Sequence, residues 1–301
     1  MQSSVKLHRP DSFAGVARRI LQAQLVLMEA SAARAVRFQS ISAVHDLRVA
    51  IRRFCAALRV FGERMPGEGV KRLRKRLQEM NRQLGPVRDA QVWCSLVKRI
   101  VSERKGLLPA DYEQCVKAAE ANCAARVQQL GRIVKGAPFR EAHECCNGLL
   151  SNNPSGSSRK QIQDQAAAFL AGKLLRAYKH LCRIEDPLVG ATGEEEHAFR
   201  RRCRRVRYLS EFTEPMMGRL VQKLSRRLKR ASNLLGDRHD AEVQVGQLAA
   251  LTETPKELLR RVTCRRHEAQ QEFNETWEKL TASHFRKRIL MELRAAKKRG
   301  L

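Results

Sequence analysis

The chain has 301 residues, and its 59 Lys and Arg against 31 Asp and Glu give a formal net charge of +28. An apolar fraction of 43% is too high for a disordered basic tail, while 5% aromatic residues and nine prolines argue against a β-sandwich or a β-barrel. A helical, globular protein remains, and the first partner to test is a polyanion. No apolar run has the length of a membrane helix or forms the core of a signal peptide, so we expect a cytoplasmic protein that binds no membrane.

Apolar residues recur at three- and four-residue steps along most of the chain, which predicts an all-α protein. In 44–65, for example, Leu47, Phe54 and Leu58 fall on one side of a helix. Helices are predicted over residues 12–38, 44–65, 71–84, 87–101, 112–134, 162–181, 197–217, 220–235, 241–251 and 256–280.

Glycine and proline separate these segments. Gly85-Pro86 and Gly236 predict tight corners, because glycine can end one helix and proline can begin the next. In such a corner Asp89 and Asp240 would lie in a first turn, where a carboxylate favours the helix dipole. The many cations after residue 285 are interpreted as a solvated end of the chain.

The polar stretch 151–160 predicts a linker between an N-terminal half, 1–150, and a C-terminal half, 161–301. Two sequence blocks occur in both halves. The second block begins at Leu84 and returns 151 positions later at Leu235. The chain is therefore interpreted as an internal duplication. In the first block a histidine and three arginines keep their residue type 152 positions later, as His45, Arg48, Arg52 and Arg53 and as His197, Arg200, Arg204 and Arg205.

The repeated cations of the first block share one helix face. At 100° per residue, the side chains of His45, Arg48, Arg52 and Arg59 fall within a sector of about 60°, on the side of the helix opposite the apolar residues. Guanidinium groups suit phosphate because their planar fork donates two parallel hydrogen bonds, and histidine adds a donor whose charge responds near neutral pH. Arg76 and Arg227 also repeat, in the helices that lead into the second block. The candidate anion ligands are therefore His45, Arg48, Arg52, Arg59, Arg76, His197, Arg200, Arg204, Arg207 and Arg227.

Catalytic signatures are missing from the sequence, which has no phosphate-binding glycine loop, dinucleotide fingerprint or HExxH pair. Nine cysteines without a CxxC pair fit a reducing compartment, and Cys145-Cys146 after His143 are interpreted as small buried thiols. We therefore expect no enzyme activity, no metal site and no other cofactor.

The two blocks resemble those of the CHAD family, the conserved histidine α-helical domain, whose signature is H-x-x-R-x-x-x-R-R followed by L-G-x-x-R/N-D. Both parts occur twice here, over about residues 10 to 290. The resemblance implies two pseudosymmetric helical bundles around a basic central channel, and non-enzymatic binding of inorganic polyphosphate with recruitment to polyphosphate granules. It also adds Arg53 and Arg205 to the candidate ligands. Cys55 replaces the arginine equivalent to Arg207, so the first half is expected to bind more weakly, with Arg59 as a substitute.

Two other functions remain open at this stage. A sequence-nonspecific RNA or DNA binder would explain the charge, although aromatic residues for base stacking are scarce. A metal-dependent phosphohydrolase would use His45 and His197, but no acidic ligands accompany them in the sequence. Oligomeric state and preferred polymer length do not follow from the sequence.

Overall fold

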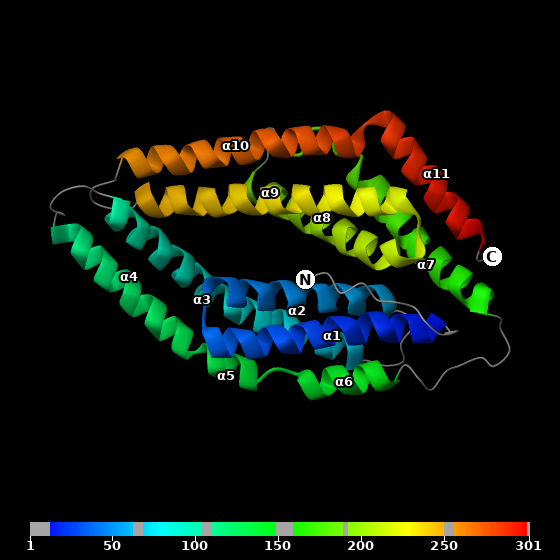
Figure 1. Cartoon of the computed structure of the whole chain (residues 1–301), viewed down its shortest axis with the longest axis horizontal. Coiled ribbons are helices and arrows are strands. Elements are labelled where there is room, and N and C mark those ends of the chain that lie inside the picture. The colour runs from blue at the N-terminus through cyan, green and yellow to red at the C-terminus, as the bar shows by residue number, and fades with distance from the viewer. Residues whose placement is uncertain are drawn as a thin grey trace. The chain divides into compact units, whose positions relative to one another are not determined.

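The computed structural model of the chain describes residues 13–62, 69–103, 110–148, 159–188, 192–249 and 256–299. Helices make up 93% of these residues, which contain no strand, so the predicted all-α class is confirmed. The helices shown in Figure 1 are α1 (Phe13–Phe38), α2 (Ile41–Phe61), α3 (Gly69–Glu103), α4 (Ala110–Gln128), α5 (Leu130–Lys135), α6 (Phe139–Gly148), α7 (Arg159–Leu181), α8 (Gly193–Thr213), α9 (Arg219–Ala249), α10 (Lys256–Thr281) and α11 (Ser283–Arg299).

The chain divides into two compact units, one of residues 17–152 and one of residues 153–301 and 1–16. In the first unit α3 is the common partner, because α2, α4, α5 and α6 all pack against it. Leu47 and Phe54 of α2 and Leu77 of α3 are completely buried in its core. Leu47 and Phe54 lie seven residues apart, or about two helical turns, on the side of α2 that the apolar pattern predicts to be core.

In the second unit α9 packs against α8 and α10, and α7 packs against α8 and α11. The ring of Phe199 meets Trp277 edge-on, with centroids 5.2 Å apart. The Tyr178 hydroxyl donates a hydrogen bond of 2.6 Å to the carbonyl oxygen of Leu280, which satisfies a buried phenol and joins α7 to α10.

The helices that carry the first repeated block have the same local structure. α2 and α8 each contain 21 residues, and their bounds lie 152 positions apart. Both begin with a hydroxyl N-cap at the same offset: Ser40 Oγ accepts from the backbone N–H of Ala43 at 3.2 Å, and Thr192 Oγ1 from that of Glu195 at 3.3 Å. The sequence repeat is thus also a repeat of helix start, helix length and capping.

The corners predicted at Gly85-Pro86 and Gly236 are wrong, because α3 and α9 continue through both sites. Pro86 removes one backbone hydrogen bond from the interior of α3. Leu84 and Val87 on either side are completely buried, and their packing outweighs the local preference for a break.

The C-terminal segment that was interpreted as a solvated end forms α11. Phe285, Ile289 and Leu293 lie on one face of it and are buried, at 8%, 0% and 0% exposure. α7 begins at Arg159, and residues 151–158 of the predicted linker lie outside the described residues. None of the helices described is long and apolar enough to cross a bilayer.

Candidate functional site

His45, Arg48, Arg52 and Arg59 lie on one side of α2 and are called the α2 stripe. Phe54 lies on the opposite side, where it is completely buried. His45 and Arg59 are exposed, whereas Arg48 and Arg52 are half-buried. The Nε atom of Arg52 is buried and has no hydrogen-bond partner among the described residues. The two half-buried arginines therefore have their stems held by packing.

In the first unit, the second repeated block lies beside the first one. Arg48 Nη1 lies 4.0 Å from Asp89 Oδ1 of α3, and a Cβ atom on Gly85 would lie 3.8 Å from Arg48 Nη2. Asp89 is in the middle of α3 rather than in a first turn, so its predicted role at the helix dipole is wrong. Instead, its carboxylate lies beside an arginine of the other motif and can orient it.

α8 repeats this arrangement with His197, Arg200 and Arg204, which are called the α8 stripe. His197 is exposed as His45 is, and Arg200 and Arg204 are half-buried as their α2 equivalents are. Each helix therefore presents one exposed histidine and two half-buried arginines on the same face.

Burial and neighbouring cations lower the pKa values of two histidines of the second unit, His197 and His239. Burial first, and then Arg201, Arg200 and Arg204, lower the pKa of His197. His239 of α9 adds to this effect, and its own pKa is lowered by burial and by Arg200. Both imidazoles are held toward their neutral forms, and an anion beside them would favour protonation.

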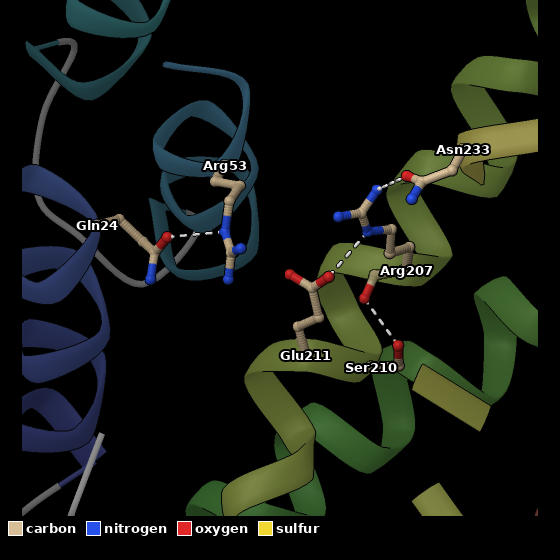
Figure 2. Close-up of polar contacts among 6 residues, drawn as sticks. All are labelled: Gln24, Arg53, Arg207, Ser210, Glu211 and Asn233. Carbon is tan, nitrogen blue, oxygen red and sulfur yellow. Dashed lines mark hydrogen bonds and ion pairs between the residues drawn. The ribbon is translucent and has the colours of Figure 1, made fainter. Parts of the chain in front are cut away.

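Arg207, which follows the α8 stripe, is paired within the unit (Figure 2). Its Nε donates to Glu211 Oε1 at 2.8 Å and its Nη1 to Asn233 Oδ1 at 3.4 Å, and Ser210 Oγ donates to its carbonyl oxygen at 2.7 Å. The side chains of Arg207 and Glu211 are only 12% and 6% exposed. The carboxylate therefore neutralises this arginine in a mostly buried position.

The equivalent position in the first unit carries no charge. Burial raises the pKa of Cys55 to about 12, against the opposing effects of Arg74 and Arg59. The thiol stays neutral near pH 7. Arg74 of α3 is thus a cation near the α2 stripe that sequence reasoning missed, since it belongs to neither repeated block.

Arg53 and Arg205 lie off the stripes, about 100° around the helix from Arg52 and Arg204. Arg53 Nε donates at 3.1 Å to Oε1 of Gln24, a residue of α1 that is only 4% exposed (Figure 2). Arg53 therefore joins α2 to α1, while Arg205 is exposed on α8.

Arg76 and Arg227 also contact neighbouring helices. Arg76 forms an ion pair with Glu141 of α6. The guanidinium of Arg227 lies 4.1 Å from the ring centroid of Phe285 and donates to the carbonyl oxygen of Lys279. Both arginines repeat between the two halves, and the contacts of both are of a kind that stabilises helix packing.

In the described part of the chain, no group of three or more His, Cys, Asp or Glu residues lies in a position to hold a metal ion. Eight described cysteines are free thiols, and burial raises the pKa values of Cys145 and Cys146 to about 11 and about 12. Such thiols are poor nucleophiles and poor metal ligands near pH 7.

Comparison with known proteins gives a family and similar solved structures. The family model of the CHAD domain matches residues 19–249. The crystal structure of the CHAD domain from the plant Ricinus communis superimposes with a TM-score of 0.60 at 17% identity, covering 98% of this chain and 96% of that chain. PptA from Streptomyces chartreusis has a TM-score of 0.57 at 15% identity, covering 89% and 100%. At these identities the likeness establishes the fold, and no curated protein matches the chain.

Proposed function

Because the chain belongs to the CHAD family, we propose that it binds inorganic polyphosphate through the α2 and α8 stripes and catalyses no reaction. The observation that carries this proposal is the twofold occurrence of one exposed histidine and two half-buried arginines on equivalent faces of α2 and α8. Packing fixes the stems of these arginines, so less side-chain entropy is lost when they bind an anion.

The chemistry of the stripes suits a chain of phosphates. His45 and Arg52 are seven residues apart, so the α2 stripe extends over roughly 10 Å of helix and can meet several successive phosphoryl groups. Arginines on one helix face repel one another, and a polyanion relieves this repulsion. The buried Nε of Arg52, which has no partner among the described residues, is the kind of donor that an anion or a water satisfies.

The alternative polyanion, RNA or DNA, is less well matched to the side chains. Proteins that bind single strands usually stack bases on exposed aromatic rings. Among the described Phe, Tyr and Trp side chains, Phe38 is the only exposed one, and the Arg37 guanidinium lies 5.2 Å from its ring centroid. Base stacking therefore contributes little here, and phosphate contacts would dominate the affinity.

The proposal is tested by binding of labelled long-chain polyphosphate to the purified protein, in competition with single-stranded RNA of equal total charge over a salt series. Retention of polyphosphate at about 150 mM salt is expected, and equal displacement by RNA would favour the nucleic-acid function. The variant Arg52→Ala/Arg204→Ala should lose most of the binding. Arg72→Ala/Arg288→Ala removes one exposed cation from each unit and is the matched control.

Two finer parts of the proposal have their own tests. Release of orthophosphate from polyphosphate in the presence of Mg²⁺ or Mn²⁺, if abolished by His45→Ala/His197→Ala, would show a phosphohydrolase instead of a binding protein. Recruitment to polyphosphate granules in the cytoplasm is expected of a fluorescent fusion and should be lost in the Arg52→Ala/Arg204→Ala variant. The shared basic channel implied by the family resemblance stays a prediction.

A further inference from the structure

A pocket of about 340 Å³ lies between α9 and α10 of the second unit, apart from the α8 stripe. One wall comes from α9 and carries all three of its cations, and α10 contributes a single acid. The lining residues are Arg226, Lys229, Arg230, Asn233, Leu234 and Glu272.

The cations of this pocket are not equivalent. Arg230 Nη2 forms an ion pair of 3.0 Å with Glu272 Oε2 of α10. Arg226 and Lys229 are exposed and have no ion pair with a carboxylate of the described residues. Three cations and one carboxylate leave the pocket a net charge of +2, concentrated at the end formed by Arg226 and Lys229.

Asn233 contributes a neutral hydrogen-bond donor to the pocket. Its Oδ1 accepts a hydrogen bond from Arg207, so the two N–H groups of the amide are not used by that bond. Asp237, one turn further along α9, lies near Asp240, Arg265 and Glu272; burial and the two acids raise its pKa, and Arg265 opposes this rise. An anion is therefore attracted to the end formed by Arg226 and Lys229, where neither cation has an ion pair with a carboxylate of the described residues.

We propose that this pocket binds the terminal phosphoryl group of a polyphosphate chain. Inner phosphoryl groups of the polymer carry one negative charge each, whereas a terminal group ionises a second time near pH 6 and carries two at neutral pH. Two cations of one pocket that have no carboxylate partner among the described residues match a dianion better than they match one repeating monoanion. This inference rests on the proposed function for the choice of polymer, and the pocket lies outside both stripes.

The test compares short polyphosphate chains that have free ends with the same chains methylated at both ends, because a methyl ester removes the second terminal charge. Isothermal titration calorimetry at pH 8 should show the full-length protein binding the free-ended chains about tenfold more tightly. Arg226→Ala/Lys229→Ala should abolish this difference. Arg288→Ala/Arg294→Ala removes two exposed cations of α11 in the same unit and should preserve it.

A second variant tests the carboxylate of the pocket. Glu272→Gln removes the carboxylate that pairs with Arg230 and should strengthen binding of free-ended chains. Equal affinity of the wild-type protein for free-ended and methylated chains would overturn the inference, as would an end preference that survives in Arg226→Ala/Lys229→Ala. If Arg52→Ala/Arg204→Ala bound long-chain polyphosphate as tightly as the wild-type protein, the proposed function of the stripes would be refuted. A preference for free-ended chains in the same experiment would still support the pocket.

Discussion

Replacement of the four half-buried stripe arginines by glutamine should change the salt dependence of polyphosphate binding by a defined amount. The variant Arg48→Gln/Arg52→Gln/Arg200→Gln/Arg204→Gln keeps side chains of comparable polarity and removes four cations. If each arginine neutralises one phosphate, the slope of log K against log[salt] should become shallower by about 0.7 per contact, or about 2.8 in total. Between 1 M and about 150 mM salt, this change corresponds to roughly 200-fold in affinity.

The assay is fluorescence anisotropy of end-labelled polyphosphate at salt concentrations between about 50 and 300 mM, a range in which counterion release dominates. The control variant replaces four exposed cations, two in each unit, with glutamine: Lys71, Arg72, Arg288 and Arg294. It has the same net charge as the test variant and should keep most of the slope. Equal slopes in the two variants would refute the stripes as the site and reduce binding to the overall charge. Unchanged helical circular dichroism in both verifies that they fold.

Three other outcomes follow from the contacts. Because burial and then the neighbouring arginines lower the pKa of His197, and a bound anion favours its charged form, polyphosphate affinity should rise as the pH falls from about 7 to about 5, and His197→Gln should flatten this profile in anisotropy titrations. Arg53→Ala, which removes the hydrogen bond to Gln24, should lower the free energy of unfolding by about 1–2 kcal/mol in urea melts. An unchanged free energy of unfolding would contradict the inference that Arg53 joins α2 to α1. Ile289→Ala should lower it by about 2–4 kcal/mol, whereas a solvated C-terminal end would give almost no change.

Helical periodicity was sufficient to predict the fold class and the core side of α2. Leu47 and Phe54 recur with helical spacing, and both are completely buried. Breaks were harder to predict, because a glycine or proline signal is local while the packing that opposes it is not. Leu84 and Val87 are buried on both sides of Pro86, and this tertiary packing keeps α3 continuous.

In the candidate site, too, features that depend on local helix geometry were predicted from the sequence, and contacts between distant residues were not. The angular spacing of Arg48 and Arg52 placed them on one face, since that depends on helix geometry alone. Nothing local predicted that Arg53 would hydrogen-bond Gln24, which lies 29 residues earlier. In α11, Phe285 and Ile289 had the spacing of a core face, but the dense positive charge around them favoured a solvated interpretation.

The difference between the two units leads to a last prediction, on which half binds more strongly. The family resemblance implied a weaker first half, because Cys55 stands where the second half has Arg207. In the structure, however, Glu211 neutralises Arg207 in a mostly buried position, which removes that reason. The Arg52→Ala change should therefore weaken polyphosphate binding at least as much as Arg204→Ala, measured by anisotropy at about 150 mM salt. A clearly larger loss in Arg204→Ala would mean that Arg207 exchanges Glu211 for phosphate when the polymer binds.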